Sequence, residues 1–495
     1  MGARRLLLAA VLLLAALAAC QVDPGSLLPA AQSQKSQEGT AGLTLVARFI
    51  HVTDTHAIDT QSPARFPGAN ALIKQAAWRP YEAYSMQLLD GIIRAVNRMH
   101  AAGTQIDFLL HTGDACDNVQ SNELQWFLQI MDGGAVNPLS GPDDRSPAQR
   151  PAPLLDPYAT FTAEGLYRTG VHGEQPTIPW YVLFGNHDVY ALGTFPVLET
   201  EPGHLKAPLP LPGRPGQVLP TWLDPLASYA HGPVSPANPG PPRLFEPLTY
   251  VSPSTSRAFF GKAFQVARMF ETVSGPPGHG FETAASPDWY SLTPAPGLRL
   301  IGLDTTDSTR QLPAQICDDG AISQVQFDFL RSELDASAAR GELVVVAGHH
   351  PSQTIRPDFG VEVTGEDLRD LLVRYPNVIL YLAGHTHRNR VIDRDGYLEI
   401  ETCSTLDLPQ EARVIEIWRD PAGTQVVVSY RMFSGDEADA SDVLLPLREA
   451  ARAIALADKD AAARQREFDS SGADPRGQPE DQQGIFRAEP ARVEP

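Results

Sequence analysis

The fold is decided by the stretch LTLVARFIHVTDTH, residues 43–56. Residues 43–52 are rich in apolar side chains and predict a buried strand. The stretch ends in Asp54-Thr55-His56, whose two polar side chains, two positions apart, can face the same side as the strand ends. Residues 84–100 carry apolar side chains at helical spacing, and residues 106–110 form a second apolar run that leads into Gly113-Asp114. This strand–helix–strand order is typical of a layered α/β fold.

Short polar motifs recur along the chain, each at the end of an apolar strand-like run. They are, in order, Asp54-Thr55-His56, Gly113-Asp114-Ala115-Cys116-Asp117, Gly185-Asn186-His187-Asp188, Gly348-His349-His350 and Gly384-His385-Thr386-His387. A single Asp-x-His motif occurs by chance about once or twice in a chain of this length and is only a hypothesis without context. Five motifs in order have a structural explanation, because loops at the carboxyl ends of strands in an open α/β sheet converge. Carboxylate, amide and imidazole groups gathered there are suitable ligands for divalent metals.

Through these five motifs the chain resembles the metallophosphoesterases of the calcineurin-like superfamily. Asp117-Asn118 and residues 401–410, which lead into a strand-like run at residues 413–418, further resemble a secreted bacterial lipoprotein-type branch of that superfamily. The resemblance extends over about residues 45–435. It implies a layered calcineurin-like phosphoesterase fold of the α/β class, with a β-sheet sandwich flanked by helices and interrupted by long insertions rich in Pro and Gly.

The resemblance also implies a role for each motif residue. Two metal ions are expected, and their identity stays open among iron, manganese and zinc. The implied ligands are Asp54, His56 and His387 for one ion, Asn186, His349 and His385 for the other, and Asp114 as the bridge between them. The other implied roles are His187 as proton donor to the leaving oxygen or stabiliser of equatorial charge, and Asp188 as the group that orients its ring. Asn118 is implied as a substrate contact, and His350 either as a substrate contact or as a residue that supports the ligands. A turn-capping role is the alternative for Asp188.

The implied chemistry follows from the pair of metal ions. Two cations roughly 3.5–4 Å apart lower the pKa of a bridging water and hold the phosphoryl oxygens for in-line displacement. The implied activity is hydrolysis of a phosphate monoester or diester by a metal-bridging hydroxide, so the expected partner is a small phosphorylated substrate. One alternative is a 5′-nucleotidase-like enzyme, although only about 60 residues follow Ser434, where those enzymes carry a separate nucleotide-binding domain. The other is a surface-binding lipoprotein on a phosphoesterase scaffold.

The composition limits the classes of partner and of metal site. The chain of 495 residues has a formal net charge of −20 at pH 7, and nothing in it resembles the basic stripe that neutralises nucleic-acid phosphates. Nucleic acid is therefore not expected to bind, and no protein partner is inferred. No CxxC pair exists among Cys116, Cys317 and Cys403, which excludes a zinc ribbon. A disulfide among them stays open, and we expect Cys116 to be a small buried side chain.

Residues 1–20 predict an export signal. Arg4 and Arg5 precede an apolar run at residues 6–17, which is too short to span a bilayer comfortably. The run ends in Leu17-Ala18-Ala19-Cys20, which resembles the lipobox of bacterial lipoproteins and implies lipidation of Cys20; an ordinary signal peptide is the alternative. Gln21 stands where many inner-membrane lipoproteins carry Asp, which favours the outer membrane. We expect an exported protein that is lipid-anchored to the membrane of the bacterial cell envelope.

The domain boundaries follow from shifts in composition. Residues 21–42 are rich in Ser, Gln, Ala and Gly and predict a flexible tether. The catalytic domain is expected over residues 43–435, with insertions at about residues 135–178 and 190–285. Their Pro and Gly content predicts loops over the mouth of the site. A C-terminal helix is predicted at residues 436–468, and the polar residues 469–495 are predicted to form a disordered tail.

Overall fold

The computed structural model describes residues 40, 42–65, 78–152, 155–212, 218–231, 248–307, 318–357, 363–436 and 442–488. The predicted signal peptide with Cys20, most of the predicted tether, Cys317 and residues 489–495 lie outside the described residues. Cys116 and Cys403 are buried and have free thiols, as expected for Cys116. Within the described ranges, no helix combines the length and the apolar character that crossing a bilayer requires.

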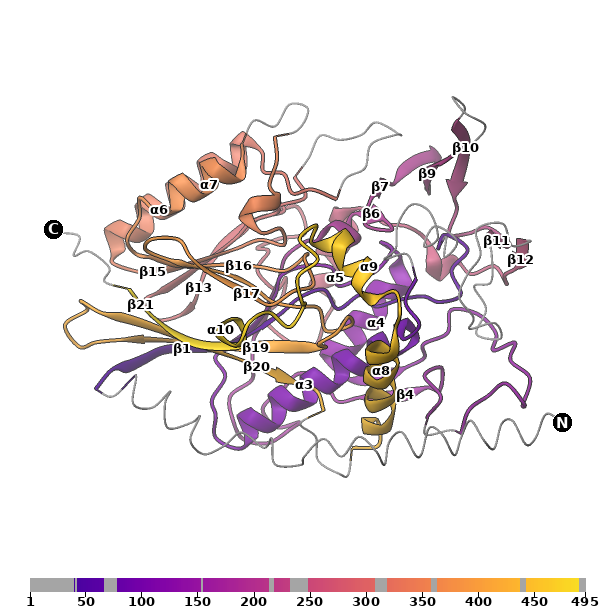
Figure 1. Ribbon diagram of the computed structural model, residues 1–495, viewed down its shortest axis with the longest axis horizontal. Coiled ribbons are helices and arrows are strands. Elements are labelled where there is room, and N and C mark those ends of the chain that lie inside the picture. Colours follow the sequence, from indigo (N-terminus) through magenta and orange to yellow (C-terminus); the bar gives the residue numbers. More distant parts are fainter. Residues whose placement is uncertain are drawn as a thin grey trace. The chain divides into compact units, whose positions relative to one another are not determined.

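Two six-stranded sheets form the centre of the compact unit that begins at Thr44 (Figure 1). The first sheet has the order β21-β20-β19-β1-β2-β5, with β1 at Thr44–Val52, β2 at Phe108–His111, β5 at Trp180–Val182, β19 at Glu411–Arg419, β20 at Val426–Ser434 and β21 at Gln483–Ala488. The second has the order β13-β14-β15-β16-β18-β17, with β13 at Tyr290–Ala295, β14 at Leu298–Gly302, β15 at Leu343–Ala347, β16 at Val378–Ala383, β17 at Arg390–Asp393 and β18 at Leu398–Glu401.

Parallel strands bring the polar motifs to one edge of each sheet. Strands β1, β2 and β5 run parallel, so the loops that carry Asp54, Asp114 and Asn186 leave the first sheet at the same edge. In the second sheet β15 and β16 run parallel, and the loops that carry His349 and His385 follow them. The convergence expected from the sequence therefore arises from strand direction.

Alternating side chains explain how the layers pack. In the second sheet Leu300 and Val345 belong to the same apolar cluster as Phe49 of the first sheet. Their neighbours Ile301 and Val344 point the other way, into a second cluster that includes apolar residues of the helices outside the sheet. Side chains of successive strand residues point to opposite faces, so one sheet face meets the other sheet and the opposite face meets helices. The layered α/β sandwich predicted from the sequence is confirmed.

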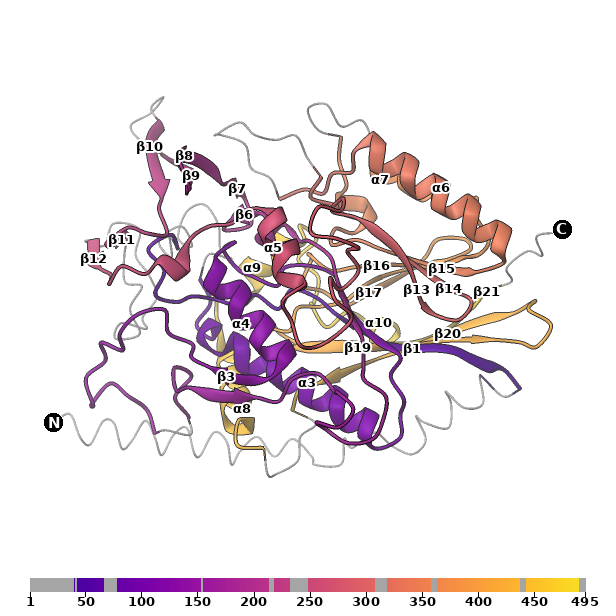
Figure 2. The ribbon, with the colours of Figure 1, turned by 180° about the vertical axis from the view of Figure 1, so that it is seen from behind.

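Helices cover the outer faces of the two sheets (Figures 1 and 2). Beside the second sheet lie α6 (Gln324–Arg340) and α7 (Gly365–Leu372), with the short 3-10 turn η8 (Ser352–Thr354) next to α7. Beside the first sheet lie α3 (Ser85–Ala101) and α4 (Ser121–Asp132), and η4 (Glu82–Tyr84) precedes α3. Helix α3 follows the apolar spacing seen in the sequence, and α6 begins at a Ser323 cap whose hydroxyl accepts from the N–H of Gln326.

The predicted insertions contain more regular structure than their composition suggests. The elements are β3 (Gly134–Val136), β4 (Phe161–Ala163), β6 (Tyr190–Ala191), β7 (Phe195–Pro196), β8 (Leu198–Glu201), β9 (His204–Pro212), β10 (Val218–Leu223), β11 (Tyr229–His231), β12 (Leu248–Tyr250), η7 (Thr255–Arg257) and α5 (Lys262–Met269). The proline-containing half of β9 pairs with β10, whereas its beginning pairs with β8. Proline is tolerated in such edge positions because the N–H on the open side of a strand needs no partner.

The C-terminal part of the chain differs from the prediction. The predicted helix at residues 436–468 consists of two helices, α8 (Leu445–Ala457) and α9 (Ala461–Phe468). The prediction of a disordered tail is wrong as far as Ala488, because α10 (Pro479–Gln482) leads into β21, which pairs antiparallel with β20. The polar composition conceals this strand because β21 is half-buried, with every second residue exposed.

Candidate metal centre

One group of donor atoms comes from the loops that follow β1 and β16. Nε2 of His387 lies 3.2 Å from Oδ1 of Asp54 and 3.1 Å from Nε2 of His56. All three side chains are buried. Asp54, His56 and His387 therefore form a set whose geometry allows them to hold one metal ion.

A second group joins the loops that follow β5, β15 and β16. Oδ1 of Asn186 lies 3.0 Å from Nε2 of His349 and 3.2 Å from Nδ1 of His385. Nδ2 of the same amide donates to the carbonyl of Gly193 at 2.8 Å. Because that carbonyl can only accept, the amide nitrogen must face it and the amide oxygen faces the two imidazoles.

The carboxylate of Asp114 lies between the two groups. Its Oδ2 is 3.2 Å from Nε2 of His349 and 3.9 Å from Nε2 of His56. Its Oδ1 accepts from the backbone N–H of His187 at 2.8 Å, which fixes the orientation of the carboxylate. Asp114 thus lies close to donor atoms of both groups, and Oδ1 of Asp54 also lies 3.9 Å from Nε2 of His349.

The distances fit cations between the donor atoms. Nδ1 of His349 donates to the carbonyl of Thr112 at 2.8 Å, so the lone pair of Nε2 is the one that a metal ion or a proton can take. That lone pair faces oxygens of Asn186 and Asp114 at 3.0 and 3.2 Å, and such acceptors repel one another unless positive charge lies between them. Metal–ligand bonds of about 2.1 Å place neighbouring ligand atoms about 3.0–3.4 Å apart. The residues present therefore fit metal ions.

The electrostatics of the cluster also favour cations. Burial alone would raise the pKa of Asp54, yet the imidazoles of His387 and His349 hold that pKa well below its usual range. Burial would likewise lower the pKa of His349, but the carboxylates of Asp114 and Asp54 raise it to about 9. In the metal-free protein an imidazole proton thus supplies the positive charge that the buried carboxylates require.

The backbone is strained at five of the residues predicted to bind metal. Asp54, His56, Asp114, His385 and His387 have φ between 45° and 67°, a region that residues other than glycine rarely adopt. Each such residue costs about 1–3 kcal/mol and keeps this conformation only where surrounding contacts impose it. Strain of this kind gathers at functional sites, and here five donor side chains share it.

Two motif glycines are required by space. A Cβ at Gly185 would overlap the carboxylate of Asp114, and a Cβ at Gly384 would overlap the side chains of Thr53 and Asp54. The loops that follow β5 and β16 therefore approach the first carboxylates more closely than any other residue type permits. This close approach is what allows distant segments to build one cluster.

Comparison with known proteins agrees with this geometry. Residues 47–235 match the family described as calcineurin-like phosphoesterase. These residues carry a calcineurin-like phosphoesterase domain. The match includes the motifs that supply Asp54, Asp114 and Asn186, and the histidines of the later motifs lie beyond it. The superfamily predicted from the motifs is confirmed, and with it the class of enzyme, a metal-dependent phosphoesterase.

Solved structures provide distant similarities. A dimetal phosphatase from Danio rerio is 13% identical, with a TM-score of 0.40 over 78% of this chain and 96% of that chain. GAP50 of Plasmodium, the anchor in the inner membrane complex, is 12% identical, with a TM-score of 0.35 over 80% and 87% of the two chains. A Staphylococcus aureus protein assigned as a 5′-nucleotidase is 12% identical, with a TM-score of 0.33 over 86% of this chain and 58% of that chain. No curated protein matches the sequence.

Buried carboxylates lie next to the Nδ1 atoms of His387 and His56, on the side of each ring that faces away from the donor cluster. Nδ1 of His387 donates to Oδ2 of Asp407 at 2.7 Å, and Nδ1 of His56 lies 3.3 Å from Oδ1 of Asp117. Arg79 links these two carboxylates, because its Nε donates to Asp407 at 2.9 Å and its Nη1 to Asp117 at 3.4 Å. Carboxylates in this position set the tautomer of a ligating imidazole and raise its basicity.

Sequence reasoning does not identify Asp407, Arg79 or Tyr81 as parts of the site. The Tyr81 hydroxyl donates to the Asp407 carboxylate beside Arg79. Asp407 lies in the 401–410 stretch and Asp117 in the Gly-Asp motif, so both segments stand out in the sequence. Neither segment, however, shows which histidine its carboxylate will meet.

The structure corrects the predicted role of Asp188. Its carboxylate accepts from the backbone N–H groups of Asp114 at 2.8 Å, Cys116 at 3.0 Å and Gly185 at 3.0 Å. The His187 ring is oriented instead by the Asp117 carbonyl, to which its Nδ1 donates at 2.6 Å. Burial and the nearby Asp114 carboxylate raise the pKa of Asp188 to about 7. Asp188 therefore holds the turn together, which is the alternative left open by the sequence.

His187 lies beside the first group of donor atoms. Its ring meets that of His56 edge-on, with centroids 4.7 Å apart. With His56 and Asp114 it forms a further set of atoms close enough to hold a metal. The structure thus leaves two roles for His187 at this position, proton transfer and metal ligation.

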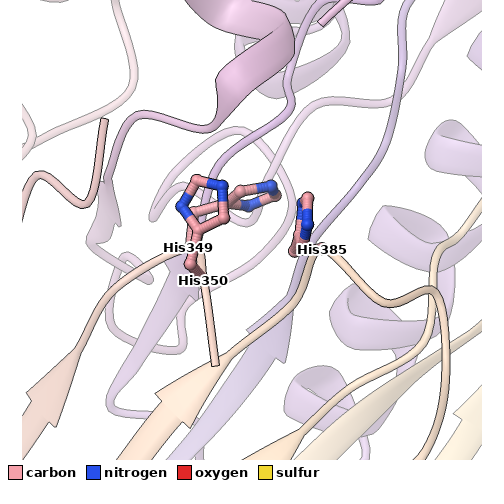
Figure 3. Close-up of side chains that lie close together, drawn as sticks. All are labelled: His349, His350 and His385. Atoms are coloured by element: carbon pink, nitrogen blue, oxygen red, sulfur yellow. The ribbon is translucent and has the colours of Figure 1, made fainter. Parts of the chain in front are cut away.

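The two residues predicted to contact substrate have different surroundings. His350 is buried next to His349 and His385 (Figure 3), and its Nδ1 lies 2.8 Å from the Thr305 hydroxyl. Burial and the two neighbouring histidines hold the pKa of His350 well below its usual range, so the ring is neutral. The side-chain oxygen of Asn118 accepts from the backbone N–H of residue 192 at 2.7 Å. A substrate contact stays a prediction for both.

Proposed function

We propose that this protein hydrolyses phosphate esters at a binuclear metal centre. One observation carries the proposal: two groups of largely buried donor atoms lie side by side, and the carboxylate of Asp114 lies close to both. Asp54, His56 and His387 are assigned to one ion, and Asn186, His349 and His385 to the other. The substrate is a small phosphate monoester or diester, and iron, manganese and zinc all suit a ligand set of oxygen and imidazole nitrogen.

The proposed metal ligands and the residues next to them have different roles in the reaction. Two bound ions would act as Lewis acids toward the phosphoryl oxygens and make a water nucleophilic near neutral pH. Nδ1 of His187 keeps its proton because it donates to the Asp117 carbonyl, so Nε2 is the atom that can gain or lose a proton. A general acid at this position would protonate the leaving oxygen. Asp407 and Asp117 hold the rings of His387 and His56 in place.

We also propose that the protein is exported and anchored by lipid to the membrane of the bacterial cell envelope. The support is the sequence of residues 1–20, in which a charged start and an apolar run end at the lipobox-like Leu17-Ala18-Ala19-Cys20. Several acyl chains hold a protein firmly at a membrane, whereas a single chain holds it only marginally. A substrate outside the cell membrane follows from this location.

The decisive experiment is an assay of the purified protein after metal removal and reconstitution. Chelator-treated protein is loaded with manganese, iron or zinc and tested on phosphomonoesters, phosphodiesters and nucleotides. We expect turnover to return with two equivalents of metal, and Asp114→Asn serves as the inactive control. Preference for nucleoside monophosphates would favour the 5′-nucleotidase-like alternative. Two bound ions without turnover on any ester would instead support a binding protein on a phosphoesterase scaffold.

A further inference from the structure

The C-terminal residues 461–488, called here the C-terminal clamp, contact the loop at residues 384–389 that carries His385 and His387. Nε2 of Gln465 donates to the carbonyl of Thr386 at 3.0 Å. The ring of Phe468 stacks on His387 with centroids 3.9 Å apart and planes 24° apart. The contacts that continue along the loop are an ion pair of Arg388 with Asp469 at 2.7 Å and a hydrogen bond from the N–H of Asn389 to the carbonyl of Pro475 at 2.8 Å.

The clamp is itself fixed to the domain at both ends. In α9, Nη1 of Arg464 donates to Asp458 at 2.7 Å and lies 3.3 Å from the Tyr81 hydroxyl. Beyond α9, Oδ1 of Asp481 accepts from the N–H of Val391 at 2.7 Å, and β21 extends the first sheet beyond β20. The segment therefore connects the first sheet, the loop at residues 384–389 and the Tyr81 region.

These contacts hold the His387 ring at its Nδ1 edge and on one face. The Asp407 carboxylate fixes Nδ1 in the plane of the ring, and Phe468 covers one face. The Arg79 guanidinium lies 5.9 Å from the centroid of the Phe468 ring and also binds Asp407. Nε2 is left facing Asp54 at 3.2 Å. Affinity of a site rises when its ligands are held in the bound geometry beforehand.

The clamp also contacts a loop whose backbone is strained. His385 and His387 have φ of 67° and 50°, which the loop keeps only if surrounding contacts outweigh the cost. The clamp contacts residues 386, 387, 388 and 389 in succession. It thus touches this strained loop along most of its length.

We propose that the C-terminal clamp is a positioning element for the metal ligand His387, so that clamp docking and metal binding stabilise each other. The inference rests on the proposed metal centre. Coupling between two binding events is reciprocal. Weaker docking of the clamp therefore lowers the affinity for the metal ion, and removal of the metal ion weakens the docking of the clamp. Each direction gives a separate measurement.

The first measurement uses Phe468→Ala. Metal dissociation constants of both ions are determined by chelator competition on metal-free protein. We expect one ion to bind about 10–100-fold more weakly, the range typical of groups that orient a metal ligand, with a smaller change at the other. Phe468→Tyr keeps the stacked ring and should restore wild-type affinity. Phe264→Ala, which removes a phenylalanine stacked on Phe260 instead, is the matched control. Wild-type affinity for both ions in Phe468→Ala overturns the proposal.

The second measurement needs no substitution. Backbone hydrogen exchange of the wild-type protein is compared with and without bound metal. We expect metal to slow exchange at residues 389 and 391, whose N–H groups bond to the clamp, and at β21, while α6 stays unchanged. Equal exchange rates of the clamp in the two forms overturn the proposal even if Phe468→Ala does not fold. A wild-type protein that binds no metal at all overturns the proposed metal centre, and the clamp proposal with it.

Discussion

Nδ1 of His387 lies 2.7 Å from Oδ2 of Asp407, so a buried carboxylate stands behind an imidazole whose other nitrogen faces Asp54. Burial alone would raise the pKa of Asp407, but Arg79 and His387 hold that pKa well below its usual range. The carboxylate is therefore ionised at neutral pH. Nδ1 keeps its proton as a consequence, and the lone pair of Nε2 is available to a metal ion.

We expect Asp407→Asn to weaken the binding of one metal ion by about 10–100-fold. The amide preserves the volume of the side chain but lacks the negative charge that raises the basicity of the imidazole. Calorimetric titration of metal-free protein measures the two ions separately. Asp420→Asn, a change in the turn between β19 and β20, is the matched control. Identical metal affinities in the two variants would show that Asp407 does not act on the ligand.

Asp114 should be the least replaceable ligand, because its carboxylate lies beside His349 of one group and His56 of the other. Asp114→Asn is expected to disturb both ions, whereas His56→Ala should weaken mainly one. Elemental analysis after dialysis against a weak chelator gives the number of ions that each variant retains. Two ions per chain and normal turnover in Asp114→Asn would contradict the bridging assignment.

The segments that carry the clustered donor side chains could be predicted from the sequence because each follows a strand with its own apolar pattern. Asp54 follows the run at residues 43–52 and Asp114 the run at residues 106–110, and parallel strands then bring the following loops together. The apolar pattern of each strand and the direction of the parallel strands therefore both indicate the position of these residues. The glycines next to Asp114 and His385 add a second local signal, since they mark close approaches of the backbone.

The groups that orient the ligands could not be predicted in the same way. Asp407 is 20 positions from His387 and lies between β18 and β19, so the contact depends on the course of that loop. For Asp188 the sequence suggests a contact that the structure does not have, because the residue is adjacent to His187. A 3-10 turn over Asn186–Asp188 directs its carboxylate to the backbone of neighbouring loops instead. In β21 the inward residues include Gly484 and Ala488, so its apolar alternation is weak.

Lipid attachment should depend on Cys20 alone. We expect Cys20→Ser to abolish incorporation of a fatty-acid analogue and to block processing of the precursor, because the thiol is the acylated group in a lipobox. The phosphoesterase domain begins well after this position, so metal content and turnover of the purified variant should equal those of the wild type. Equal labelling of the two proteins in growing cells would exclude the lipobox.

His187 should separate metal binding from chemistry. If its Nε2 donates a proton to the leaving oxygen, His187→Ala keeps both metal ions and loses about 10²–10⁴-fold in turnover on an alkyl phosphate ester. The nitrophenolate leaving group of a nitrophenyl ester departs without a proton, so the loss of turnover should be much smaller on that substrate. His204→Ala, which alters a histidine paired with Asp224 in the insertion, controls for general effects of the substitution. An equal loss on both esters would indicate charge stabilisation in place of proton transfer. Loss of one metal ion would instead make His187 a ligand, as its position beside His56 and Asp114 also allows.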